Sequence, residues 1–313
     1  MPSSTQISQY TRTVKQLSKQ LGFDYCGIAQ AQQLDEDARK LETWLNKGYH
    51  AGMSYMERNF DLRTNPKLLV PGARSVITLM MNYYPEQQQS ADAPKIAKYA
   101  FGQDYHDVIR AKLHAFLAGL REQVGEVEGR GFVDSAPVLE RRWAQKSGLG
   151  WIGKNANLIT KASGSFFFLA TLIVDLELEY DDPYAKDFCG TCTRCLDACP
   201  TQAIVSPSVI DANKCISYLT IELKDELIPD ELSGTFQNWM FGCDVSQDVS
   251  PWIRFSSPHQ EEGFQPIPEI LNFTTGDWEQ LNEDFFKVLL KHSPIKRSKW
   301  KGIQRNLQFI KTS

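Results

Sequence analysis

FCGTCTRCLDACP, residues 188–200, is the most informative segment of this 313-residue chain. It carries four cysteines separated by two, two and three residues, and a proline follows the fourth. Bacterial ferredoxins bind [4Fe–4S] clusters with this spacing, and the fourth cysteine then ligates the other of two clusters. Zinc ribbons use separated pairs of cysteines instead, so an iron–sulfur site is favoured over zinc. The segment predicts cluster ligands at Cys189, Cys192, Cys195 and Cys199.

A second, incomplete copy of the motif follows in FGCDVSQDVSPW, residues 241–252. Cys243, Ser246 and Ser250 repeat the spacers of two and three residues, and a proline comes next. Cys215 is the candidate for the missing first ligand. The crossed rule of two-cluster ferredoxins assigns one cluster to Cys189, Cys192, Cys195 and Ser250, and the other to Cys199, Cys215, Cys243 and Ser246.

Serine at two of the expected ligand positions leaves the state of the clusters open. A serine hydroxyl is harder and far more basic than a thiol, so it competes poorly for iron. Three thiolates can still hold a cluster, with water, a serine oxygen or an open iron at the fourth corner, or as a three-iron form. The alternative is that Ser246 and Ser250 are hydrogen-bonding turn residues and that one or both clusters are absent. We expect at least one cluster, because the first motif is intact.

Composition limits the class of protein. With 42% hydrophobic and 23% charged residues, the chain is typical of globular proteins of one or two domains. The longest apolar run, residues 166–174, is too short to cross a bilayer, and the N-terminus has no apolar signal segment. We therefore expect a cytoplasmic protein without membrane contact. The odd cysteine count argues against a disulfide framework, and Cys26 is expected to be a buried core residue.

Apolar periodicity divides the chain into three parts. Residues 1–182 alternate strands and helices, which predicts an α/β (α+β) domain. A ferredoxin-like two-cluster module is expected over 183–258, and a helical segment with a basic tail over 259–313. The run 75–83 lacks alternation, as in a strand buried on both faces. Strands are expected at 25–29, 75–83, 131–133 and 165–174, and helices at 4–21, 35–47, 107–124, 138–148, 275–292 and 295–311.

Charge is uneven along the chain. The net charge of −4 provides no general case for nucleic-acid binding. Residues 291–313, however, carry seven lysines and arginines and no acidic residue. Such a tail suits contacts with phosphates. The alternative is the solvated face of a terminal helix.

Several longer motifs resemble the epoxyqueuosine reductase family, and the resemblance covers nearly the whole chain. Its most specific parts are VDSAPVLERRWAQKSGLGWIGKNANLI (133–159) and CISYLTIE (215–222). The family typically has cysteine where this chain has Ser246 and Ser250. Besides the cysteine run, the matching segments are YHAGMSYMERN (49–59), LLVPGARSVI (68–77), GQDYHDVIR (102–110), FGCD (241–244) and SPIKRSKWKGIQRN (293–306).

The resemblance implies an activity and its cofactors. Members of this family reduce the epoxide of epoxyqueuosine at the tRNA wobble position to queuosine, using cobalamin fed with electrons by two [4Fe–4S] clusters. The N-terminal domain, related to that of reductive dehalogenases, is expected to hold the corrinoid over its sheet. Residues expected to bind the cofactor are Arg58, Lys98, Asp134, Asn157 and Ser217.

The resemblance also implies partners. We expect a tRNA bearing epoxyqueuosine in its anticodon loop, contacted by the basic tail, where Trp300 lies among cations and suits stacking on an unpaired base. The electron donor is expected to be an unidentified reductase, ferredoxin or flavodoxin, and the chain a monomer. The alternative is a non-catalytic or impaired corrinoid- or tRNA-binding homologue, whose clusters are lost because Ser246 and Ser250 replace cysteine.

Asp134 is the candidate catalytic residue, because the resemblance places it at the family's proton-donor position. Opening an epoxide leaves an alkoxide, which a nearby acid can protonate. A carboxylic acid that donates near neutral pH needs a pKa raised by burial or by a nearby negative charge. From the residues alone, an aspartate before Ser135-Ala136-Pro137 favours a helix N-cap instead. His106, at the start of an amphipathic helix, is interpreted as a structural residue and not as a cobalt ligand.

Overall fold

The N-terminal part is built on a four-stranded sheet that is antiparallel throughout. The computed structural model describes residues 2–225 and 227–311, and its strand order is β1-β2-β7-β4. Strands far apart in the sequence are therefore neighbours. An antiparallel sheet covered by helices is an α+β arrangement, as expected. The strands are β1 (Tyr25–Gln30), β2 (Ser75–Asn82), β4 (Gly129–Phe132) and β7 (Phe167–Val174).

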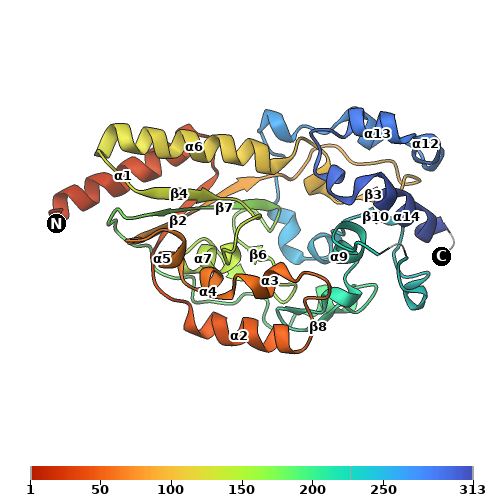
Figure 1. Ribbon diagram of the computed structural model, residues 1–313, viewed down its shortest axis with the longest axis horizontal. Helices are drawn as coiled ribbons and strands as arrows, with labels where there is room; N and C mark the ends of the chain where they lie inside the picture. The colour runs from red at the N-terminus through yellow and green to blue at the C-terminus, as the bar shows by residue number, and fades with distance from the viewer. Residues whose placement is uncertain (1, 226, 312–313) are drawn as a thin grey trace.

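The central strand β2 is buried on both faces, as its unbroken apolar run predicts. Ile77 and Leu79 join the core formed with α1 (Ser4–Gln20) and α6 (Tyr105–Val124), which cover one face of the sheet (Figure 1). Val76 packs in the opposite core with Trp143 of α7 (Glu140–Lys146). Beyond α7 runs a further layer of helices: α2 (Asp35–Asn46), α3 (Tyr55–Arg58), α4 (Phe60–Thr64) and α5 (Pro66–Leu69).

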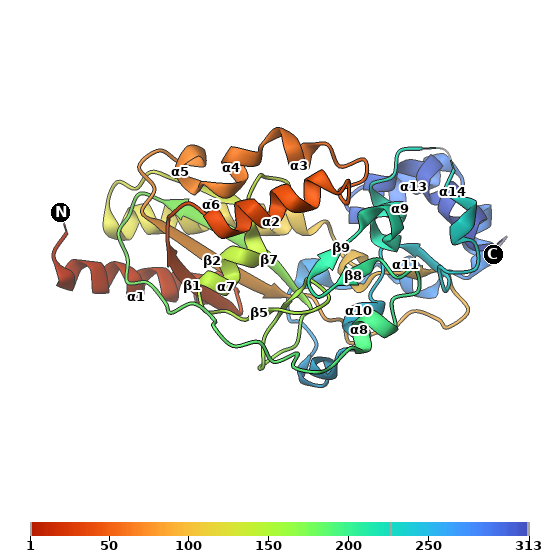
Figure 2. The same ribbon diagram turned by 90° about the horizontal axis from the view of Figure 1, so that it is seen from below.

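The cysteine-rich region is mostly turns with short elements. α8 (Arg194–Asp197) follows the first cysteines, α9 (Ile216–Ile221) follows Cys215, and α10 (Val245–Asp248) follows Cys243. The views of Figures 1 and 2 show this region beside the end of the sheet, between the N-terminal part and the C-terminal helices. Its strands are β8 (Ile204–Ser206), β9 (Val209–Ile210) and β10 (Trp239–Phe241).

The C-terminal segment is helical, but the prediction of one continuous helix over 275–292 is wrong. The backbone of Leu281 is extended and ends α12 (Thr275–Gln280). Asn282 then starts α13 (Glu283–Leu289), because its side chain accepts the Phe285 N–H at 2.8 Å. The helix expected over 295–311 begins as a 3-10 turn over Pro294–Ser298 and continues as α14 (Lys299–Lys311). A short helix, α11 (Pro268–Asn272), was not expected.

Packing crosses both expected domain boundaries, which remain predictions. β3 (Lys95–Ile96), from the N-terminal part, pairs in parallel with β10 of the cysteine-rich region. Phe101, Phe241 and Trp278, one from each part, lie in a single buried core. The two ends of the chain lie at opposite ends of the molecule (Figure 1). In the described part of the chain, no helix has the length and apolarity that a membrane span requires.

Candidate active site and cluster-binding centre

Asp134 lies in the loop after β4, against the start of α6. Its backbone is left-handed, with a φ of +49° that few non-glycine residues adopt. The carboxylate oxygen Oδ2 accepts a hydrogen bond from the Tyr105 hydroxyl at 2.7 Å and lies 3.5 Å from Nε2 of His106. The backbone N–H of Asp134 donates to Oε1 of Glu140 at 3.1 Å. These contacts hold the residue while 53% of its side-chain surface remains exposed.

The interpretation of Asp134 as a helix N-cap is wrong. The nearest helix, α7, begins at Glu140. Its N-cap is Leu139, which makes no side-chain capping hydrogen bond. The side chain of Asp134 is directed instead to residues of α6, far away in the sequence.

The expectation of a raised pKa for Asp134 is also wrong. Burial acts to raise the pKa, but the interactions with His106 and Tyr105 outweigh it and lower the pKa to about 2. Both partners favour the charged form of the carboxyl group. Asp134 is therefore a carboxylate at neutral pH and needs a proton from elsewhere before it can donate one.

Glu140 lies beside this carboxylate, and its surroundings favour its neutral form. Burial first, and then the charge of Asp134, raise the pKa of Glu140 well above its usual range. Its side chain accepts the Asp134 N–H through Oε1. Glu140 therefore anchors the left-handed loop.

We expect the Glu140→Gln variant to keep most of its activity and the Glu140→Ala variant to lose most of it. Glutamine is neutral, like the protonated acid, and its amide oxygen can accept the Asp134 N–H. Alanine leaves this N–H without its partner, at a cost of about 1–3 kcal/mol. Initial reduction rates, together with hydrogen exchange of the amides of residues 133–138, measure the effect. Equal losses in the two variants would contradict an anchoring role.

The C-terminal segment reaches the same site through two cations. Lys296 Nζ pairs with Asp104 Oδ2 at 2.8 Å, and Arg297 Nη2 pairs with Glu222 Oε1 at 2.5 Å. The charge of Arg297 also contributes to the low pKa of Asp134, behind the effects of burial, His106 and Tyr105. Two residues of the basic tail therefore lie close to the candidate site around Asp134.

Of the other residues in the basic tail, some pack against the protein and others are exposed to solvent. Arg305 donates to the backbone carbonyls of Leu219, Leu223 and Asp225. Trp300 packs beside Phe286 in the helical core, with ring centroids 5.6 Å apart, so its position favours the packing alternative over base stacking. The remaining cations differ, because Lys291, Lys299 and Lys301 are exposed.

The other residues expected to bind the cofactor are spread over several elements. Arg58 ends α3 and is exposed, Asn157 lies half-buried in the turn after Trp151–Ile152, and Ser217 lies half-buried in α9. Among the described residues, none of these three hydrogen-bonds to Asp134. Their roles toward the cofactor stay predictions.

Lys98 is placed differently from the other candidates, because its ammonium group is paired within the protein. Nζ lies 2.7 Å from Oδ1 of Asp248 and 3.5 Å from Oδ2 of Asp244, and the backbone N–H of Lys98 donates to the same Asp244 oxygen at 2.8 Å. Only 17% of the lysine side chain and 3% of the Asp244 side chain are exposed. This ion pair ties the N-terminal part to the second cysteine motif.

We expect the Lys98→Met variant to be destabilised by about 3–5 kcal/mol, the usual cost of leaving one charge of a buried pair without its partner. Urea unfolding of the two proteins, prepared identically, measures the difference. Lys40→Met is the matched control, since Lys40 forms an exposed pair with Glu36 and its loss should cost below about 1 kcal/mol. Similar midpoints for all three proteins would contradict the structural role.

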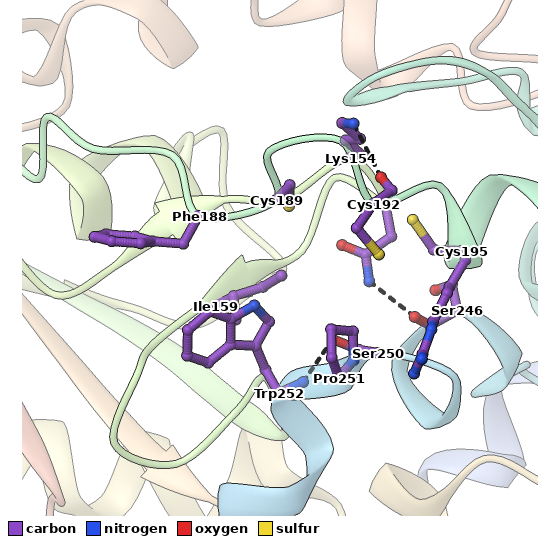
Figure 3. Close-up of a pocket in the computed structure, with 12 residues that line it drawn as sticks. Lys154, Ile159, Phe188, Cys189, Cys192, Cys195, Ser246, Ser250, Pro251 and Trp252 are labelled. Carbon is purple, nitrogen blue, oxygen red and sulfur yellow. Dashed lines mark hydrogen bonds between the residues drawn. The ribbon is translucent and has the colours of Figure 1, made fainter.

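The first group of thiols shares a pocket with both serines of the second motif (Figure 3). Lys154 Nζ supports the cysteine loop by donating to the carbonyls of Gly190 at 2.7 Å and Cys192 at 2.9 Å. Phe188 and Trp252 form an aromatic side of the pocket, with ring centroids 6.3 Å apart. The cysteines and serines that line it are Cys189, Cys192, Cys195, Ser246 and Ser250.

The two serines make different contacts in this pocket. Ser250 Oγ accepts the Trp252 N–H at 3.4 Å and caps the 3-10 turn Pro251–Phe255, so it serves as a turn residue and also faces the first thiol group. The backbone carbonyl of Ser246 accepts a hydrogen bond from Asn155 Nδ2 at 3.3 Å. The assignment of Ser246 to the second cluster stays a prediction.

The second group of thiols brings together residues that are distant in the sequence. Burial first, and then the neighbouring Asp244, Cys215 and Cys199, raise the pKa of Cys243 to about 12. The thiol of Cys215 likewise interacts with that of Cys199. These are the three cysteines that the crossed rule assigns to one cluster.

The donor chemistry of both groups fits iron–sulfur clusters, because each presents three soft sulfur ligands and thiolates are what such clusters require. Among the described residues, no set of three or more His, Cys, Asp or Glu side chains is placed to hold a single metal ion. Cys26 lies apart from both groups, and burial raises its pKa to about 11, as for an inert core thiol.

Three residues around Asp134 were missed or undervalued in the sequence. Asp104 and His106 lie in GQDYHDVIR, where Asp104 received no role and His106 only a structural one. Glu140 lies in the long central motif. Titratable residues are frequent in these segments, which could have pointed to a functional site. Only contacts between distant parts of the fold show which of these residues contact Asp134.

Comparisons with known families agree with this geometry. Residues 63–135 match the family described as epoxyqueuosine reductase QueG, DUF1730, and residues 188–253 match the 4Fe-4S double cluster binding domain. The epoxyqueuosine reductase of Cyclobacterium marinum is 58% identical over 307 residues, covering 97% of this chain and 98% of the relative.

Solved structures show the same relationship. A crystal structure of epoxyqueuosine reductase with an epoxyqueuosine-modified tRNA-Tyr stem loop has a TM-score of 0.87 and 31% identity, covering 96% of this chain and 80% of that one. A catabolic reductive dehalogenase shares the fold, with a TM-score of 0.50 and 16% identity over 97% of this chain and 38% of its own. The chain shares 58% identity with a member of the epoxyqueuosine reductase family over 97% of its length, and its fold matches a solved member. The chain therefore belongs to the epoxyqueuosine reductase family.

Proposed function

We propose that this protein reduces the epoxide of epoxyqueuosine in tRNA to queuosine, consuming two electrons and two protons and releasing water. The observation that carries the proposal is the half-exposed Asp134 carboxylate, held by Tyr105 and close to His106, in one chain with two groups of thiols. The carboxylate is placed to handle protons and the thiols to hold an electron relay. Nothing specific in the comparisons favours a non-catalytic homologue.

The electron relay is proposed to consist of two [4Fe–4S] clusters, complete or lacking a fourth ligand at Ser246 and Ser250. A corrinoid is proposed as the second cofactor, and when bound it supplies a strong two-electron reductant to the epoxide. The exposed Arg58 and the half-buried Asn157 and Ser217 offer hydrogen-bonding groups that suit the amides around a corrin ring.

The tRNA is proposed to bind over the C-terminal segment. Lys291, Lys299 and Lys301 are exposed, and Arg297 lies beside Asp134, so the basic segment leads toward the active site. Cations that face solvent can contact phosphates, which fixes the register of a nucleic acid without reading its sequence. We further propose that the protein works in the cytoplasm as a monomer and takes electrons from a small reductase, ferredoxin or flavodoxin.

The test is anaerobic reconstitution with iron, sulfide and cobalamin, followed by incubation with a chemical reductant and tRNA that contains epoxyqueuosine. Mass spectrometry of the digested nucleosides measures conversion to queuosine. Conversion that requires both cofactors supports the proposal. Corrinoid binding without clusters or conversion would instead identify the impaired homologue, for which the capping role of Ser250 offers a reason.

A further inference from the structure

His106 lies between two carboxylates at the first turn of α6. Its Nδ1 is 2.8 Å from Oδ1 of Asp104, whose other oxygen pairs with Lys296 at 2.8 Å. Its Nε2 is buried, has no hydrogen-bond partner among the described residues, and lies 3.5 Å from Oδ2 of Asp134. The imidazole ring stacks on Tyr105, with ring centroids 4.1 Å apart. The histidine is thus fixed on one side and poised toward the candidate catalytic carboxylate on the other.

The charges around His106 favour its protonated form. Burial acts to lower the pKa of this histidine, but Asp104 and Asp134 outweigh it and raise the pKa to about 9. His106 is therefore an imidazolium at neutral pH, and it loses the proton as the pH rises through about 9. The titratable and charged groups that face it or its two carboxylates come from distant parts of the chain: Tyr55, Tyr99, Asp104, Tyr105, Asp134, Glu140, Lys296 and Arg297.

Among the described residues, His106 is the best-placed source of a proton for Asp134. Asp134 is ionised, and burial together with the Asp134 charge raises the pKa of Tyr105 far above its usual range, so that hydroxyl holds its proton. The pKa of Glu140 is also raised, and its side chain contacts the backbone N–H of Asp134 and not the carboxylate. His106 combines an exchangeable proton with a nitrogen 3.5 Å from the Asp134 carboxylate.

We propose that His106 stores the proton that Asp134 passes to the substrate, and that Asp104 and Lys296 hold His106 for this purpose. The inference rests on the proposed function. The epoxide carbon accepts an electron pair from the two-electron reductant of the proposed function as its C–O bond breaks. The oxygen then takes a proton from the Asp134 carboxyl group, while Asp134 takes the Nε2 proton of His106. Imidazolium and alkoxide become imidazole and alcohol, so charge and protons balance. The proton on Nδ1 remains with Asp104, and solvent recharges Nε2 after turnover.

The first test does not use activity. Nitrogen-15 NMR of histidine-labelled protein follows the five histidines through a pH titration, and the His106→Gln variant assigns the signal. We expect a pKa near 9 for His106 and a clear decrease in both the Asp134→Asn and Asp104→Asn variants. A pKa near the ordinary value of about 6.5, or no change in either variant, would overturn the proposal.

The second test is the pH dependence of single-turnover reduction. We expect His106→Gln to slow the reaction by about 10²-fold or more at neutral pH, the scale of a lost proton transfer. His114→Gln is the matched control, because His114 lies exposed on the same helix. A normal rate in His106→Gln would overturn the proposal.

Asp104→Asn separates proton storage from a structural role. Asp104 also caps α6 by accepting the His106 N–H at 3.1 Å, and asparagine caps a helix about as well as aspartate. Since the variant lowers the pKa of His106, its rate should recover as the pH falls, whereas structural damage would not respond in this way. A wild-type protein without any conversion would reject the proposed function, and the NMR titration would still decide the state of His106.

Discussion

Replacement of Asp134 by asparagine is expected to lower the rate of epoxide reduction by about 10²–10⁴-fold, the usual contribution of a positioned acid or base. Asparagine keeps the shape of the side chain and can still accept the Tyr105 hydrogen bond, but it cannot take up and release a proton. Asp134→Ala should be at least as slow, because the Tyr105 hydroxyl then also loses its acceptor. Single-turnover conversion of epoxyqueuosine in tRNA measures the effect.

The iron content should not change in these variants, since Asp134 lies outside both thiol groups. Corrinoid absorption and iron content are measured on the same preparations, which separates a lost cofactor from a lost proton transfer. Asp92→Asn is a suitable control, because Asp92 is an exposed carboxylate in the loop before β3. Unchanged turnover in Asp134→Asn would reject Asp134 as the residue that protonates the substrate.

The second large effect is expected from restoring thiols at positions 246 and 250. The double variant Ser246→Cys, Ser250→Cys should approach about eight irons per chain, as two [4Fe–4S] clusters require. The unaltered protein should contain fewer irons and lose them faster to a chelator, because hydroxyl groups compete poorly with thiolates for iron. Iron and acid-labile sulfide analysis after anaerobic reconstitution measures both quantities.

The single variants test the crossed assignment of ligands. By the crossed rule, Ser250→Cys should complete the cluster of Cys189, Cys192 and Cys195, and Ser246→Cys the other cluster. Both serines line the pocket of the first group, so iron content has to separate the two assignments. Electron paramagnetic resonance distinguishes three-iron from four-iron forms in each. Ser257→Cys is the control, since this exposed serine belongs to neither motif. The absence of iron from the unaltered protein and from all variants would exclude the relay.

The elements most predictable from the sequence were those whose signal is local. The apolar run of β2 predicted a strand buried on both faces, and the periodicity of α6 predicted a long amphipathic helix, because side-chain period follows directly from backbone geometry. The expected helix over 275–292 failed for an equally local reason. Asn282 is a strong helix N-cap, and its side chain starts a new helix where apolar periodicity alone suggested continuity.

The ionisation of Asp134 could not be predicted from its own segment. Burial of the carboxyl group acts to raise its pKa. The outcome is reversed by Tyr105 and His106, which are brought to the carboxylate by the packing of α6 on the sheet. Lys98 is a similar case, because its partners Asp244 and Asp248 come from the second cysteine motif.

The sequence by itself determined the ligand chemistry, since the spacing of Cys189 to Cys199 already sets how a short backbone can present thiols to a cluster. It also located the two serines and, through resemblance, Asp134. Only the tertiary structure decided which groups share protons and charge with that carboxylate. Asp104 and Lys296 are nearly 200 positions apart, and their ion pair beside His106 exists because the C-terminal segment packs against the start of α6. Electrostatic effects depend on distance in space, and spacing along a chain sets that distance only for near neighbours.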